Sequence, residues 1–255
     1  MLLCGLLGLA VGSFLNVVVW RVPRGESVVS PPSACPACAQ PVRPRDNVPV
    51  VGWLLLGGRC RDCEASIPAR YPVVEALTAV LFVVLALRLG PDPVLPAYLY
   101  LAAVGLALAL IDLDVRRLPD ALTLPSYPVV AVLLALGAAL GSGSGDLVRA
   151  LLGGLGMAAF YFTLFFAHPR GMGFGDVKLS GVLGMATAWS GWGAFGVGLF
   201  AGFLLGGLWG IALLVSGRGG RKSAVPFGPF MLAGTLLAVL AGQPLADAYV
   251  RLAFA

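Results

Sequence analysis

The run AFGVGLFAGFLLGGLWGIALLV, residues Ala194–Val215, decides the fold class of this chain. Its 22 residues include no charged side chain. About 20 apolar residues in a helix cross the ~30 Å hydrocarbon core of a bilayer, because each residue adds about 1.5 Å. The run therefore predicts a membrane-spanning helix.

The composition of the whole chain extends this prediction. Hydrophobic residues make up 59% of the 255 residues and charged residues only 11%, whereas soluble domains carry about 25% charged residues. The excess apolar surface must face lipid, so we expect an all-α polytopic membrane protein with about eight transmembrane helices. The sixth run is short and interrupted by glycine. The eight runs are Leu2–Trp20, Val73–Leu89, Ala97–Ile111, Ala121–Leu140, Leu147–Ala167, Leu179–Trp189, Ala194–Val215 and Phe227–Ala241.

The basic residues are divided unevenly between the two sides that these spans define. If the segment after the first span is cytoplasmic, only Arg88, Arg149 and Arg251 fall outside. This is the positive-inside pattern, which predicts a multi-pass protein of the plasma (inner) membrane and explains the net charge of +5 without nucleic acid as a partner. The cytoplasmic set is Arg21, Arg24, Arg43, Arg45, Arg59, Arg61, Arg70, Arg116, Arg117, Arg170, Lys178, Arg218, Arg221 and Lys222.

Glycine is frequent in the second half of the chain. Gly153, Gly154 and Gly156 form one group, and Gly202, Gly206, Gly207 and Gly210 form another. Small residues let membrane helices approach closely, so we expect both groups to lie in contacts between helices.

Four of the five cysteines form two CxxC pairs. Cys35 and Cys38 are separated from Cys60 and Cys63 by 21 residues. Two such pairs complete a tetrahedral zinc site, and four protein ligands leave no open position for a substrate, so we expect structural zinc. A redox CxxC or two unrelated thiol pairs is the weaker alternative. We therefore expect a first transmembrane helix over 1–20, a cytoplasmic four-cysteine domain over 21–71 and a membrane-embedded domain over 72–255.

Acidic residues lie at the ends of two spans. Asp112 and Asp114 end the third span, and Asp176 precedes the sixth. The topology places all three on the cytoplasmic side. Two carboxylates that meet in a dry site share one proton, so one can activate water while the other polarises a peptide carbonyl.

The residues alone leave two choices open at this position. Asp112 and Asp114 project from nearly opposite faces of a helix, because successive residues turn by about 100°, and only one can face the bundle. We favour an interfacial ion pair for Asp114 and a helix N-cap for Asp120. For Asp112 and Asp176, catalysis and a proton or ion path both remain possible.

Five short motifs are spread along the chain: Gly12–Val18 (GSFLNVV), Arg45–Pro49 (RDNVP), Arg70–Glu75 (RYPVVE), Ile111–Asp120 (IDLDVRRLPD) and Gly173–Asp176 (GFGD). Together they resemble motifs of the bacterial type IV prepilin peptidases, whose Gly-x-Gly-Asp motif also occurs in presenilin-like membrane proteases. In that family the first catalytic aspartate lies eight positions before the residue that closes a Pro-Asp or Pro-Asn pair. The resemblance therefore implies that Asp112 and Asp176 are catalytic, with Asp120 closing the pattern.

The resemblance also implies the reaction. The family removes the short, positively charged leader of type IV prepilins and pseudopilins at the cytoplasmic face, which serves type IV pili and protein secretion. Members with four cysteines typically also N-methylate the new N-terminus with S-adenosylmethionine, whose site we cannot place from the sequence. The alternatives are a proton-coupled transporter that uses the same carboxylates and a zinc-stabilised membrane scaffold. Transporter sites lie near the bilayer midplane, whereas both aspartates are expected at one interface, so we favour the peptidase.

Overall fold

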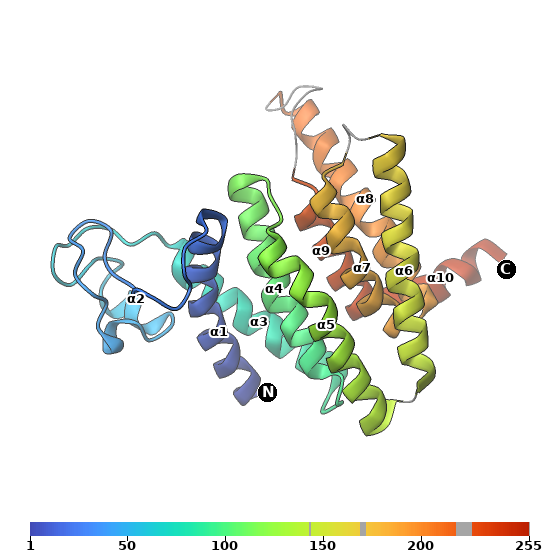
Figure 1. Cartoon of the computed structure of the whole chain (residues 1–255), viewed down its shortest axis with the longest axis horizontal. Coiled ribbons are helices and arrows are strands. Elements are labelled where there is room, and N and C mark those ends of the chain that lie inside the picture. Colours follow the sequence, from blue (N-terminus) through green and yellow to red (C-terminus); the bar gives the residue numbers. More distant parts are fainter. Residues whose placement is uncertain (143, 169–171, 218–225, 255) are drawn as a thin grey trace. The chain divides into compact units, whose positions relative to one another are not determined.

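The computed structural model describes residues 1–142, 144–168, 172–217 and 226–254, and these are mostly helical (Figure 1). Within these ranges β-pairing is limited to two isolated bridges, so the predicted all-α class is confirmed. Four residues of the predicted cytoplasmic set lie outside the described residues: Arg170, Arg218, Arg221 and Lys222. Gly171 also lies outside them.

Seven helical segments in the described part of the chain are long and apolar enough to cross a membrane. The sixth predicted span, Leu179–Trp189, is not among them and lies within α7 (Phe174–Trp189). This helix has only 16 residues, which is about 24 Å at 1.5 Å per residue. The seven segments are Leu2–Arg24, Arg70–Leu89, Leu95–Val115, Asp120–Gly141, Asp146–Ala167, Trp192–Val215 and Gly228–Ala253.

The chain divides into two compact units, of which the first comprises Met1–Pro91 with Ala102–Ala107. Its long helices α1 (Leu2–Arg21) and α3 (Arg70–Leu89) pack together along a face of small residues on α1. A Cβ on Gly12 would lie 2.7 Å from the Glu75 Cα atom, so only glycine fits at this contact. Between the two helices the chain forms the cysteine segment, with the short 3₁₀ turns Val22–Arg24 and Pro44–Asp46 and the helix α2 (Val51–Leu55).

The second unit comprises Asp92–Leu101 and Leu108–Ala255. It contains both ends of α4 and all the helices that follow it in the sequence. These helices are α4 (Leu95–Val115), α5 (Asp120–Gly137), α6 (Ser144–Ala167), α7 (Phe174–Trp189), α8 (Trp192–Val215), α9 (Gly228–Leu237) and α10 (Gln243–Phe254), with π-turns at Ala138–Ser142 and Ala238–Gly242.

Helix α7 forms the core of the second unit. Asp176, Val177 and every residue from Leu179 to Trp189 are buried, and α6 lies beside α7 along its length (Figure 1). A Cβ on Gly184 of α7 would lie 2.5 Å from the Gly153 carbonyl oxygen of α6. The two backbones therefore touch directly. Because α7 is enclosed by protein, it does not need the length or hydropathy of a lipid-facing span.

The predicted role of the glycines in helix packing is correct for some positions and wrong for others. Gly153, Gly154 and Gly202 all face neighbouring helices closely. A Cβ on Gly207 or Gly210 would meet nothing within 4 Å. These two glycines do not line a contact among the described residues, because they lie on a face of α8 that no other helix covers.

Candidate functional site

Asp112 is held in place at the C-terminal end of α4. Its side chain is buried, with only 6% of the residue exposed, whereas Asp114 is exposed. The turn of about 100° per residue separates the two side chains as the sequence predicted. The Asp112 Oδ2 atom accepts a hydrogen bond from the Gly228 N–H at 3.1 Å. A residue at the start of α9 therefore fixes the carboxylate.

Asp176 lies in the first turn of α7 and is likewise buried. Its Oδ2 atom accepts a hydrogen bond from the Gly173 N–H at 3.1 Å, and its own N–H donates to the Gly173 carbonyl oxygen at 3.1 Å. This reciprocal pair closes the turn before the helix. The N-terminal end of a helix also favours a negative charge, which suits an aspartate at this position.

The structure brings the two aspartates to one place in the second unit. Leu118 connects their surroundings, because its side chain packs against both Gly175 and Gly228. A Cβ on Gly175 would lie 3.0 Å from the Leu118 Cβ, and a Cβ on Gly228 would lie 3.3 Å from the Leu118 Cδ2. Two acidic groups thus share a buried environment, as acid–base catalysis by a carboxyl pair requires.

Asp120 does not act as the predicted N-cap. Pro119, in extended conformation, is the residue that precedes α5, and Asp120 is the first residue inside the helix. The Asp120 carboxylate instead binds the Lys178 Nζ atom, at 2.7 and 2.8 Å. Tyr127 adds a second tie, because its hydroxyl donates to the Lys178 carbonyl oxygen at 2.6 Å. Two contacts from α5 therefore fix the turn of α7 that carries Asp176.

Sequence reasoning missed Gly228 and Leu118. The available signal for Gly228 was the segment Pro226–Pro229, where prolines flank a glycine at the start of an apolar run. That run was expected to begin on the same side of the membrane as both aspartates. Leu118 carried no such signal, since a single leucine near a span end is ordinary.

The four cysteines form a separate cluster in the first unit. All four Sγ atoms lie within 4.8 Å of one another. The Cys35–Cys63 and Cys38–Cys60 sulfur distances are 3.8 and 4.0 Å, far longer than the ~2.0 Å of a disulfide. A tetrahedron of thiolates about 2.3 Å from zinc has edges of about 3.8 Å. The cluster therefore has the size and donor set of a four-thiolate zinc site.

The two CxxC turns share one backbone geometry. Ala39 and Glu64, each directly after the second cysteine of its pair, have φ angles of 58° and 59°. The N–H of the first cysteine donates to a residue five positions later in both turns, Cys35 to Gln40 and Cys60 to Ala65. In the first turn the N–H groups of Cys38 and Ala37 lower the pKa of the Cys35 thiol to about 7. A lowered pKa favours the thiolate that binds metal at Cys35, whereas hydrogen bonds with neighbouring thiols, Cys38 first, raise the pKa of Cys63 to about 12.

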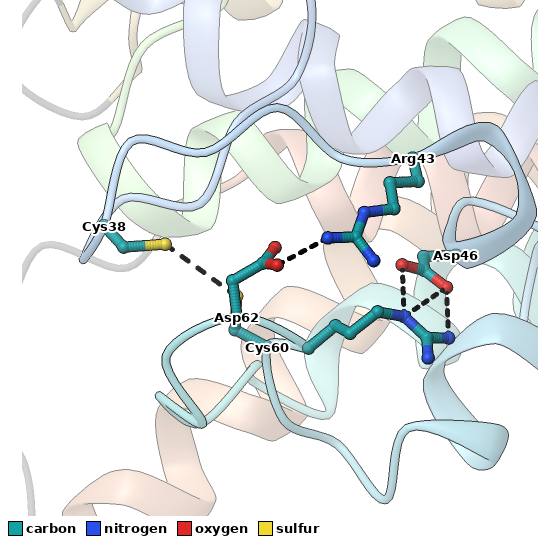
Figure 2. Close-up of polar contacts among 6 residues, drawn as sticks. Cys38, Arg43, Asp46, Cys60 and Asp62 are labelled. Carbon is teal, nitrogen blue, oxygen red and sulfur yellow. Dashed lines mark hydrogen bonds and ion pairs between the residues drawn. The ribbon is translucent and has the colours of Figure 1, made fainter.

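Ion pairs connect the second CxxC turn to the segment between the turns. Figure 2 shows Arg43 directed at Asp62, and the two groups are 2.6 Å apart. The Arg61 guanidinium forms hydrogen bonds with both carboxylate oxygens of Asp46, the shortest at 2.6 Å. The hydrogen bond from Arg61 lowers the pKa of the Asp46 carboxyl. These two pairs hold the turns at the spacing that the cysteine cluster requires.

A buried carboxylate attaches the cysteine segment to α3. The Glu75 Oε2 atom accepts a hydrogen bond from the Val50 N–H at 2.6 Å. Val50 precedes α2 and has a φ of 61°, which is uncommon for a branched residue. The bond helps to hold this conformation.

Comparisons with known proteins agree with this picture. Residues 6–89 match the model of the bacterial peptidase A24 N-terminal domain, and residues 99–211 match that of the type IV leader peptidase family. Relatives called prepilin leader peptidase/N-methyltransferase occur in Aeromonas hydrophila (36% identical, covering 96% of this chain and 92% of the relative) and Aeromonas salmonicida strain A449 (35%, 96% and 92%). A third, from Neisseria gonorrhoeae, is 37% identical over 89% of this chain and 85% of its own length. No solved structure is significantly similar to the chain.

Proposed function

The chain belongs to the type IV leader peptidase family, and from that premise we propose that it is a prepilin leader peptidase and N-methyltransferase. As a membrane aspartic endopeptidase, it removes the short leader of type IV prepilins or pseudopilins. It then methylates the new N-terminal amine. The relatives carry this pair of activities in their names, and the match extends over nearly the whole of both chains. The comparisons lend no support to proton-coupled transport.

The pair of buried aspartates is the observation that carries the peptidase proposal. Asp112 and Asp176 lie far apart in the sequence, yet both are buried beside Leu118, each fixed by a glycine N–H. In the proposed reaction the ionised carboxylate takes a proton from water, and the oxygen of that water attacks the scissile carbonyl carbon. The protonated carboxyl donates its proton to the carbonyl oxygen. When the tetrahedral intermediate collapses, the C–N bond breaks and the leaving amine takes up a proton.

The four cysteines support a structural metal in the same protein. Cys35, Cys38, Cys60 and Cys63 would hold zinc through four thiolates, which leaves no coordination position for a substrate. The metal would thus stabilise the polar segment and take no part in peptide cleavage. S-adenosylmethionine would supply the methyl group of the second activity, and we assign no residues to its binding.

The proposal includes a location and an orientation. The helical segments suit a multi-pass inner-membrane protein, and the distribution of basic residues supports a cytoplasmic cysteine domain and active site. We propose the division into a first helix (1–20), a zinc domain (21–71) and a peptidase domain (72–255). A cytoplasmic site suits leaders that are positively charged and remain inside.

A cleavage assay tests the peptidase proposal. The purified protein in detergent should cut a prepilin, and Asp112→Asn and Asp176→Asn should each lower the rate by at least ~10³-fold, because each removes one partner of the acid–base pair. Asp114→Asn, two residues away and exposed, is the matched control and should cut normally. Melting temperatures would verify that all three variants fold. Normal cleavage by either buried-aspartate variant, or none by the wild type, would overturn the proposal.

A further inference from the structure

We propose that Gly228 is a positioning residue of the active site, which makes the start of α9 a third component beside the two aspartate segments. This inference rests on the proposed peptidase function. Its starting point is the hydrogen bond from the Gly228 N–H to the Asp112 Oδ2, which joins residues 116 positions apart in the sequence.

The Gly228 N–H is available because it lies at a helix start. The first N–H groups of a helix have no partner within that helix. Pro229 has no N–H, and the Phe230 N–H donates to the Phe227 carbonyl oxygen at 3.0 Å. Gly228 therefore supplies the N–H of this turn that has no partner within the helix, and the Asp112 carboxylate accepts its hydrogen bond. The partial positive charge at the helix start adds to the attraction for a carboxylate.

Glycine is the residue that leaves the Asp112 carboxylate undisturbed at this position. A Cβ on residue 228 would lie 2.9 Å from the Asp112 Oδ2 and 3.3 Å from the Leu118 Cδ2. A side chain would therefore displace the carboxylate or Leu118, which also packs against Gly175 beside Asp176. Because Gly228 has no side chain, its N–H can reach Asp112 and Leu118 can keep its contact with Gly175, the residue before Asp176.

Aromatic packing holds the start of α9 in place. The Phe227 ring lies 5.2 Å from that of Phe203 on α8 and 6.3 Å from that of Tyr161 on α6. Tyr161 is itself buried. The residue before Gly228 is thus anchored in the second unit, so the donor has a fixed position relative to α4.

Kinetics of Gly228→Ala provide the first test. We expect kcat for prepilin cleavage to fall by about 10- to 100-fold with KM changed by no more than about twofold, because the variant misplaces a reacting group without altering substrate binding. Gly234→Ala is the packing control on the same helix, since its Cβ would lie 2.6 Å from the Gly202 backbone N and away from both aspartates. It should lower the melting temperature but leave kcat per folded molecule unchanged. If both variants lose activity only in proportion to lost stability, the inference fails while the peptidase function stands.

A second test does not depend on activity. In a double-mutant cycle, Gly228→Ala should lower the melting temperature more in the wild type than in Asp112→Ala. The reason is that the added methyl group disturbs the Asp112 carboxylate only where that carboxylate is present. Equal shifts in the two backgrounds would overturn the inference even if the wild type cut no prepilin.

Discussion

The cysteine segment of the first unit and the α6–α7 pair of the second are held together in opposite ways. In the cysteine segment, a few side chains meet in defined pairs: four thiols in a cluster and two Arg–Asp pairs. In the α6–α7 pair, the absence of side chains at Gly153 and Gly184 lets two backbones meet. The first region therefore depends on chemical state, such as bound metal and protonation, whereas the second depends on shape.

Of the changes that test this contrast, metal removal should have the largest effect on folding. A structural zinc site contributes about 10–16 kcal/mol of binding free energy, so Cys38→Ser or a strong chelator should unfold the cysteine segment. Helices α6 and α7 should remain folded. Metal content and limited proteolysis would measure the loss within the segment, and thermal unfolding in detergent would follow the helices. Cys4→Ser, in α1 and outside the cluster, is the control and should retain the metal. A metal-free protein that resists protease as well as the wild type would contradict this view.

An added methyl group in the α6–α7 contact should have the next largest effect. Gly184→Ala would place a Cβ 2.5 Å from the Gly153 carbonyl oxygen, and such overpacking costs about 1–3 kcal/mol of unfolding free energy. Gly207→Ala adds the same methyl group on α8 where nothing lies within 4 Å. It should be neutral or stabilising by up to ~1 kcal/mol, because alanine favours a helix. Melting temperatures of the two variants provide the comparison, and equal values would show that the backbone contact is unimportant.

Loss of one ion pair should have the smallest effect. Asp46→Asn removes the partner of Arg61 and should make the cysteine segment slightly more sensitive to protease. Because Arg61 lowers the pKa of Asp46, the pair stabilises the folded state above the usual carboxyl pKa of 3.8 and loses this effect only as the pH falls through the lowered value. The difference between wild type and variant should therefore be the same at about pH 6 and about pH 8. A difference that disappears within this interval would assign the effect to another group.

The sequence predicted the membrane class, the cysteine cluster and the opposite orientation of Asp112 and Asp114 because each depends on a local pattern. The resemblance to the peptidase family, and not the periodicity, indicated Asp112 as the residue of the site. Length and hydropathy mark a span, cysteine spacing marks a metal site, and helical periodicity separates Asp112 from Asp114. The catalytic roles of Asp112 and Asp176 stay a prediction.

Other features could not be predicted from local sequence patterns, because they depend on contacts between residues that are distant in the sequence. The bond between Gly228 and Asp112 is set by how α9 meets α4. The pairing of Asp120 with Lys178 replaced the expected N-cap, because a cation from α7 lies within reach. Glycines face a neighbour or open space according to the helix arrangement, as Gly184 and Gly207 show.

The enclosure of α7 changes which substitutions it should tolerate. A lipid-facing helix is selected for hydropathy, but this one carries Ser180 and Thr187, each fully buried with its hydroxyl bound to a carbonyl oxygen of its own helix. Exchanges that preserve volume, including polar ones whose hydroxyl can make the same bond, should therefore be accepted more readily than larger aliphatic residues. In its mutational tolerance α7 should behave like the central helix of a water-soluble protein, although it lies inside a membrane protein.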